Sequence, residues 1–160
     1  MIKKIDEAHI EECVKVIKES FSTVAKEFGI TEENAPRYTA FATTKKRLNW
    51  HMFEEKRPMY AFFDGEKIVG YYSLLLKDTD ECELNNLCVL PEYRHKGIGE
   101  KLIVHAFLIA RNYDCVKMNI SIVEENKPLK NWYESFGFIH THSQKFDFFP
   151  FTSGYMVKEL

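Results

Sequence analysis

The chain has 160 residues, of which 45% are hydrophobic and 29% are charged, and its formal net charge is -2 at pH 7. This length suits one domain with a sizeable core and is too short for two ordinary enzymatic domains, so we expect a single domain over residues 1–160. The nearly balanced charge gives no overall attraction to phosphate backbones, which disfavours general nucleic-acid binding.

Cysteine usage and the N-terminal sequence indicate the compartment. The four cysteines form no C-x-x-C pair and have no spacing typical of a zinc site; they are Cys13, Cys82, Cys88 and Cys115. The opening sequence MIKKIDEAHI contains no apolar signal region, and the longest apolar stretch, residues 103–110, is interrupted by His105. We therefore expect reduced thiols, a cytoplasmic location and no membrane association.

The chain begins with the pattern of a short strand over residues 2–5, and Asp6 is a suitable N-cap for the helix that follows. Spacing gives that helix one apolar face, made of Ile10, Cys13, Val14, Ile17 and Phe21. Residues 31–57 are polar and basic with scattered apolar positions, and there we expect one or two short helices.

Three antiparallel strands are predicted next. Residues 59–63 and 68–76 flank Asp64-Gly65, a dipeptide that favours two-residue hairpin turns. An acidic turn at residues 78–81 then leads into a strand over residues 83–90. These three strands would form one half of a sheet, in which neighbouring strands are antiparallel.

Helices and strands alternate in the second half of the chain. The expected elements are a helix through Leu102, Ala106, Ile109 and Tyr113, a strand over residues 115–122, a helix over residues 126–136, and closing strands over residues 138–148 and 151–158. Pro150 separates the closing strands, where a central strand could not easily accept it. The element order predicts an α/β fold built on one mixed sheet.

The loop after residue 90 carries the clearest chemistry. Gly97 and Gly99 lack a Cβ, so a ligand can approach the backbone N–H groups, and the following helix directs its positive end to the same place. Arg94, His95 and Lys96 add local positive charge, as a diphosphate ligand would require. The loop lacks the third glycine of a dinucleotide-binding fingerprint and the Gly-Lys-Ser/Thr of a P-loop.

Two sequence blocks resemble the GNAT superfamily of N-acetyltransferases. Arg94-x-x-Gly97-x-Gly99 matches the family's acetyl-CoA loop signature, Gln/Arg-x-x-Gly-x-Gly/Ala. The block from Asn126 to Tyr133 and on to Gly137-Phe138 resembles the later family motif, in which an Asn precedes a helix that ends in Tyr and Gly-Phe. The resemblance covers essentially the whole chain and implies an N-acetyltransferase that uses acetyl-CoA as donor. It also implies a mixed, mostly antiparallel twisted sheet of about seven strands, flanked by helices and splayed between the fourth and fifth strands.

The same resemblance implies roles for individual residues. Main-chain groups of Leu87 and Val89 would pair with the pantetheine arm of acetyl-CoA. Asn126 would contact either the pantetheine or a nearby backbone group of the protein. The pyrophosphate would be held by the backbone N–H groups of His95, Lys96, Gly97, Ile98, Gly99 and Glu100. Cys88 would lie beside the thioester channel, where we expect a small buried thiol rather than a nucleophile. Tyr133 matches the family's general acid, and its alternative role is a packed aromatic at a helix end.

Glu83 is the candidate general base, because certain family members carry a glutamate at this point of the strand. Alternation would place Glu83, Asn85, Leu87 and Val89 on one strand face, within reach of the cleft directly or through a water. The alternative is a solvated carboxylate that ends the acidic turn at residues 78–81. That turn would also attract a cationic amine if it bordered the acceptor.

The remaining alternatives concern ligands and partners. We expect no metal site, because His140 and His142 have no third ligand at a suitable spacing. The acceptor is an amine of a small molecule or a peptide, and the oligomeric state stays open, with a homodimer as one possibility. The alternative function is a non-catalytic acyl-CoA-binding or sensing module on the same fold.

Overall fold

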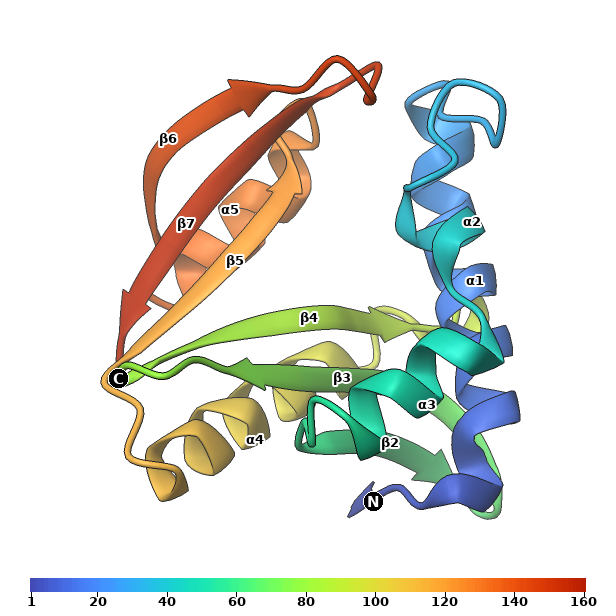
Figure 1. The fold of residues 1–160 in the computed structure, drawn as a ribbon, viewed down its shortest axis with the longest axis vertical. Coiled ribbons are helices and arrows are strands. Elements are labelled where there is room, and N and C mark those ends of the chain that lie inside the picture. The colour runs from blue at the N-terminus through green and yellow to red at the C-terminus, as the bar shows by residue number, and fades with distance from the viewer.

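The computed structural model describes residues 1–160 and contains one seven-stranded mixed sheet with helices on both faces (Figure 1). The strands are β1 (Ile2–Lys4), β2 (Met59–Asp64), β3 (Lys67–Leu76), β4 (Glu81–Val89), β5 (Lys117–Val123), β6 (Ile139–Lys145) and β7 (Thr152–Glu159). They lie in the order β1-β2-β3-β4-β5-β7-β6, and every neighbouring pair is antiparallel except β4 and β5. The expected fold is therefore confirmed.

Five α-helices cover the sheet. They are α1 (Ile10–Glu27), α2 (Thr39–Ala42), α3 (Lys45–Phe53), α4 (Ile98–Asn112) and α5 (Lys127–Ser135), with short 3-10 turns at Glu7–His9 and Pro91–Tyr93. The α1 to α3 group covers one face, and α4 and α5 lie on the other (Figure 1). None of these helices combines the length and the apolar composition needed to cross a membrane.

The predicted helix starts depend on capping side chains. Asp6 accepts a hydrogen bond from the Ala8 N–H and so caps the 3-10 turn that leads into α1. Thr44 caps α3 and Asn126 caps α5 in the same way. The cap at Asn126 fixes the direction in which α5 leaves the end of β5.

The sheet is open at one point. β4 and β5 pair only over three residues each, from Glu81 opposite Lys117 to Glu83 opposite Asn119. Beyond Glu83 the two strands diverge, and Figure 1 shows the V-shaped gap that widens toward α1 and α2. The splay between the fourth and fifth strands is thus present, and the main-chain groups along the β5-facing edge of β4 have no strand partner there.

Two predicted strands are shorter than expected. β5 begins at Lys117 because Asp114 adopts a left-handed conformation (φ 60°) and turns the chain before the strand starts. β6 ends at Lys145 because Phe146, Phe148 and Phe149 leave the strand and pack on one another in the β6–β7 loop. These aromatic residues form one rim of the cleft described below.

Gly70 of β3 lies in close contact with α4. A Cβ at this position would lie 2.9 Å from Leu102 Cδ1 and 3.2 Å from the Cys88 carbonyl oxygen, and Leu102 is fully buried. We expect Gly70→Ala to lower the free energy of unfolding by about 2 kcal/mol, since overpacking forces core side chains off their rotamers. Denaturant unfolding measures this loss. Adding Leu102→Val should recover part of it, whereas an unchanged midpoint in Gly70→Ala would contradict the tight contact.

Candidate active site

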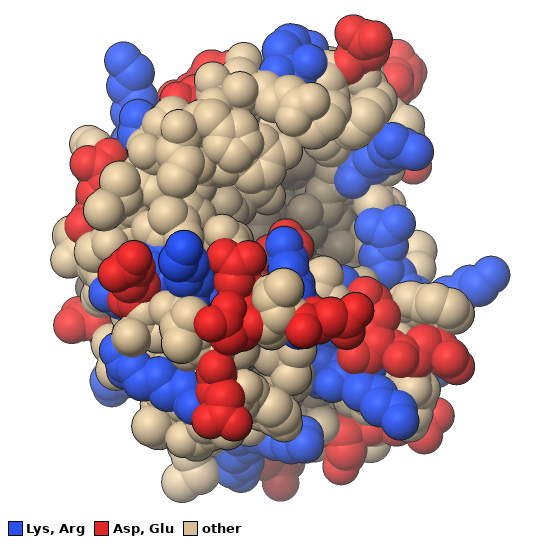
Figure 2. Space-filling view, turned by 60° about the vertical axis from the view of Figure 1, so that its left-hand side comes forward, with Lys and Arg blue, Asp and Glu red and all other residues tan.

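The gap between β4 and β5 is a cleft of about 240 Å³ lined by 19 residues. The lining comes from β4, β5, β7, α5 and its cap, the end of α1, the α1–α2 connection, the start of α2 and the β6–β7 loop. Leu87, Asn126 and Tyr133 are the sequence-predicted site residues among them. Figure 2 shows a hollow whose visible walls are mostly tan, with charged side chains on the surface around it.

The β4 wall of the cleft contains a bulge that the sequence pattern did not reveal. Asn86 has a φ of 57°, and the pairing with β3 jumps from Ser73 opposite Asn85 to Tyr71 opposite Cys88. Because residues opposite each other share a face, Asn85 and Cys88 point to the same side of the sheet. The expectation that Leu87 and Val89 share a face with Glu83 and Asn85 is therefore wrong, since the extra residue reverses the alternation.

Tyr133 is held in the cleft wall by aromatic neighbours. Its ring packs edge-on against Trp132 (5.0 Å between centroids) and Phe138 (5.4 Å), and the residue is only 6% exposed. Its hydroxyl makes no hydrogen bond within the protein, although the residue lines the cleft. Burial raises the pKa of Tyr133 above its usual range, so the hydroxyl remains a proton donor at neutral pH.

The loop before α4 has the geometry that an anion requires. His95 (φ 61°) and Gly97 (φ 82°) both adopt left-handed conformations, and Gly97 is the N-cap of α4. The backbone N–H groups of residues 95–100 donate no hydrogen bond in the loop or at the helix cap. These donors and the positive end of α4 fit a pyrophosphate group.

The Arg94 side chain is turned into the protein instead of toward this anion site. It donates from Nε to the Val89 carbonyl oxygen (3.1 Å), from Nη1 to Thr23 Oγ1 (3.0 Å) and from Nη2 to the Ser20 carbonyl oxygen (2.9 Å). The guanidinium therefore ties the end of β4 to α1. Its contribution to cofactor binding would come through the position of the loop, not through a free charge.

Asn126 and Cys88 also have defined contacts. Asn126 Oδ1 accepts a hydrogen bond from the Leu129 N–H (3.3 Å), which is the backbone contact foreseen as one of its two alternatives. Cys88 points away from the cleft toward Ser20 of α1, and burial raises the pKa of its thiol to about 12. A protonated, buried thiol is no nucleophile, in keeping with the passive role expected for Cys88.

Glu83 lies at the closed end of the V, where β4 still pairs with β5. Its carboxylate forms an ion pair with Lys77 Nζ at 3.4 Å, and the residue does not line the cleft. The acidic turn is at the same closed end, because it connects β3 to β4. The structure thus brings Tyr133, Asn126 and Leu87 together and leaves Glu83 apart, so its role as general base stays a prediction.

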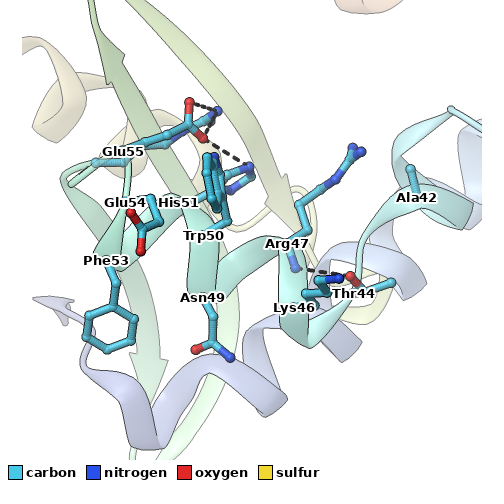
Figure 3. A pocket seen from close by; sticks show the side chains of 11 residues that line it. Ala42, Thr44, Lys46, Arg47, Asn49, Trp50, His51, Phe53, Glu54 and Glu55 are labelled. Carbon is cyan, nitrogen blue, oxygen red and sulfur yellow. Dashed lines mark hydrogen bonds and ion pairs between the residues drawn. The ribbon is translucent and has the colours of Figure 1, made fainter.

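A second hollow, of about 750 Å³, lies along α3 (Figure 3). At one end of it Glu55 accepts a hydrogen bond from Arg57 Nη2 (3.1 Å) and lies 3.8 Å from His51 Nε2. Arg57 Nη1 donates to Asn85 Oδ1 at 2.9 Å, which links α3 to the cleft wall beside the bulge. Burial and the neighbouring cations of Arg57 and Arg47 lower the pKa of His51 to about 4, so its imidazole is neutral at pH 7.

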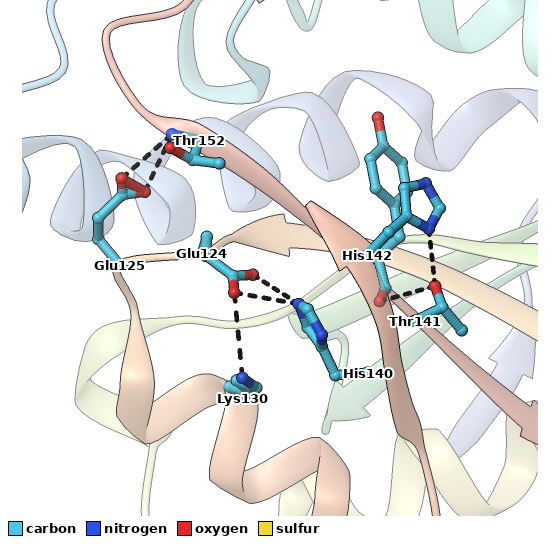
Figure 4. A network of polar contacts seen from close by, with 8 residues as sticks. Glu124, Glu125, Lys130, His140, Thr141, His142 and Thr152 are labelled. Atoms are coloured by element: carbon cyan, nitrogen blue, oxygen red, sulfur yellow. Dashed lines mark hydrogen bonds and ion pairs between the residues drawn. The ribbon is translucent and has the colours of Figure 1, made fainter. Parts of the chain in front are cut away.

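A polar network outside the cleft connects the elements that form its β5 side (Figure 4). Glu124 pairs with His140 Nε2 at 3.0 Å and with Lys130 Nζ at 3.9 Å, and Glu125 accepts from the Thr152 N–H. These contacts connect the end of β5 to α5, β6 and β7. His140 is therefore engaged with a carboxylate, and His142 stacks on Tyr155.

Sequence reasoning missed the aromatic and basic rim opposite β4. Tyr38 packs edge-on against Phe151 with 5.7 Å between centroids, and Arg37 Cζ lies 4.5 Å from the centre of the Phe148 ring. These contacts join the α1–α2 connection to the β6–β7 loop across the mouth of the cleft. The run of phenylalanines after Lys145 was the available signal, but it was interpreted as strand.

Residues 22–138 match the sequence model described as the acetyltransferase (GNAT) family. A mouse thialysine N-epsilon-acetyltransferase is 31% identical over 77 residues, which are 46% of this chain and 45% of that protein. A Bacillus subtilis (strain 168) relative is 28% identical over 94 residues, or 59% of this chain and 62% of its own length. The chain thus spans less than two thirds of these curated relatives.

Solved structures match over more of the chain. The PaiA N-acetyltransferase of Thermoplasma acidophilum, in complex with coenzyme A, has a TM-score of 0.85 and 21% identity and covers 100% of this chain and 98% of its own. The ribosomal-protein-S18-alanine N-acetyltransferase of Escherichia coli has a TM-score of 0.75 and 15% identity, with 99% and 92% covered. At these identities the likeness establishes the fold.

Proposed function

The chain belongs to the GNAT acetyltransferase family, and from this premise we propose that it is an acetyl-CoA-dependent N-acetyltransferase. One observation carries the proposal. The cleft that Tyr133 lines with its unpartnered hydroxyl runs along β4, and the end of β4 leads into the loop whose N–H groups, at residues 95–100, are free. The first feature fits a pyrophosphate, and the second fits proton donation to a leaving group.

The reaction needs a neutral amine, a positioned thioester and a proton for the departing sulfur. Acetyl-CoA supplies the activated acetyl group. The free edge of β4 near Leu87 and Val89 would pair with the pantetheine arm and orient it, and Asn126 would contact it from α5. As the amine forms the new C–N bond and the C–S bond breaks, Tyr133 gives its proton to sulfur and recovers one from the attacking nitrogen.

The acceptor is proposed only as an amine at this stage. The named acceptors of two relatives differ in kind, since one is the alanine of a ribosomal protein and the other is the ε-amine of thialysine. Arg37 lines the cleft and lies over the Phe148 ring, and both residues are outside the two sequence blocks that would hold the cofactor. The acceptor would therefore bind on this side of the cleft. The cytoplasmic location stays a prediction, and the oligomeric state stays open, with a homodimer as one possibility.

Release of free coenzyme A thiol in the presence of an amine panel tests the proposal. We expect thiol release that depends on both acetyl-CoA and an amine, together with binding of coenzyme A in the absence of amine. A protein that binds coenzyme A but releases no thiol with any amine would instead support the alternative, an acyl-CoA-binding or sensing module. Loss of coenzyme A binding itself would contradict both.

Glu83→Gln tests the predicted general base. Because Glu83 pairs with Lys77 and does not line the cleft, we expect kcat to fall less than about threefold, well below the usual contribution of a general base. The acidic limb of the pH profile of kcat/KM should also persist in the variant. Disappearance of that limb would establish Glu83 as the base, acting through a water, and would overturn this expectation.

A further inference from the structure

Arg37 is the single charged residue among the 19 that line the cleft. It is exposed, lies on the α1–α2 connection and forms no ion pair with any carboxylate of the chain. Its guanidinium is held over the Phe148 ring at 4.5 Å, so its position is defined although its charge is unpaired. An unpaired, positioned guanidinium in a cleft is a suitable partner for an anionic group.

The same cleft offers no carboxylate to a second cation. No aspartate or glutamate lines it, and the acidic turn and Glu83 lie at its closed end. Aromatic rings line the cleft and can attract an ammonium group, but without a carboxylate they would have to offset the repulsion between that group and Arg37. A diamine would therefore bring a second positive charge toward Arg37 without a carboxylate to compensate it, and two like charges at close range repel each other.

We propose that the acceptor is an amine that also carries an anionic group, either a carboxylate or a phosphonate, and that Arg37 binds this group. This inference rests on the proposed function and names its substrate class. The guanidinium would orient the acceptor so that the nitrogen faces the thioester and Tyr133.

Thiol release with acceptors of matched length tests the inference. β-Alanine and 2-aminoethylphosphonate carry an anion at the same number of bonds from the nitrogen, whereas β-alaninamide carries an uncharged amide there and 1,3-diaminopropane a second amine. Alanine and alaninamide form the shorter matched pair. We expect kcat/KM for the anionic member of each pair to exceed that for the amide by at least about tenfold, as one charge-assisted contact provides.

Two variants assign this preference to Arg37. Arg37→Met keeps the contact with Phe148 but removes the charge, so the ratio between anionic and neutral acceptors should fall to near one through KM while coenzyme A affinity is unchanged. Arg37→Glu should favour 1,3-diaminopropane. Arg47→Met is the matched control, because Arg47 is exposed on α3 outside the cleft, and its ratio should equal that of the wild type.

The outcomes separate the inference from the proposed function. Equal turnover of anionic, neutral and dicationic amines would overturn the inference and leave the acetyltransferase intact, as would an unchanged ratio in Arg37→Met. Efficient turnover of an alanine-initiated peptide amide without acidic residues would also overturn it, in favour of a protein N-terminus. Absence of thiol release with every acceptor would overturn the proposed function and this inference together.

Discussion

Replacing Tyr133 by Phe should lower kcat about 100-fold, because general acid catalysis commonly contributes that much to a transfer of this kind. The substitution removes only the hydroxyl, and the ring can keep its edge contacts with Trp132 and Phe138. Coenzyme A affinity should therefore stay within about twofold, since the loss concerns the transition state and not ground-state binding. Steady-state kinetics at saturating acetyl-CoA, combined with direct titration of coenzyme A, measures both quantities.

The pH dependence gives Tyr133 a second signature. Tyr133 acts as an acid, so activity would be lost only as the pH rises through its pKa. Burial raises that pKa above its usual value, and we expect kcat to show no alkaline limb up to about pH 9. Tyr155→Phe serves as the matched control, because Tyr155 lies on β7 outside the cleft and stacks on His142. Unchanged turnover in Tyr133→Phe would remove the assignment.

Local sequence signals predicted the fold well because each acts over a few residues. Gly65 (φ 63°) permits the turn between Asp64 and Lys67, which lies one residue later than the predicted Asp64-Gly65 turn because Asp64 still pairs in β2. Asp6 specifies a helix start, and Gly97 permits the left-handed conformation that begins α4. The bulge at Asn86 has no such signal. Asparagine tolerates positive φ better than most residues, but only the pairing with β3 shows where the extra residue is inserted.

The candidate site was predictable where one motif supplies the chemistry and unpredictable where distant segments meet. The loop over residues 95–100 is contiguous, so its donors could be inferred from glycine spacing. The rim formed by Arg37 and Phe148 joins positions more than 100 residues apart, and the separation of Glu83 from the cleft depends on where β4 and β5 diverge. The charge pattern also predicted that Arg94 adds positive charge for the ligand, but its guanidinium hydrogen-bonds to Val89, Thr23 and Ser20 inside the protein.

Arg94→Ala should weaken coenzyme A binding about tenfold or more and lower the free energy of unfolding by about 3 kcal/mol. The guanidinium makes three hydrogen bonds that hold the end of β4 to α1, and bonds to charged groups are among the stronger ones in proteins. Without them the Val89 carbonyl and the Ser20 carbonyl each lose a donor. The loop over residues 95–100 would then begin from an untethered strand end.

Two further variants distinguish this tethering role from a direct charge effect on the cofactor. Arg94→Lys keeps the positive charge, but a single ammonium group cannot donate to the three acceptors that the planar guanidinium reaches. This variant should therefore show most of the loss in stability and coenzyme A affinity seen in Arg94→Ala. Thr23→Val removes one acceptor on α1, does not touch the cleft, and should reproduce part of the loss in both stability and affinity. Titration of coenzyme A and chemical denaturation of each variant provide the two measurements.

The combination of Arg94→Ala with Thr23→Val completes the test. If the two side chains act through one contact, their effects on the free energy of unfolding will not add, because the second change removes an interaction that is already absent. Strict additivity, or full recovery of coenzyme A affinity in Arg94→Lys, would show instead that the charge of Arg94 acts on the pyrophosphate directly. The hydrogen bonds to Thr23 and Ser20 favour the first outcome, since they leave the guanidinium facing α1 and not the loop donors.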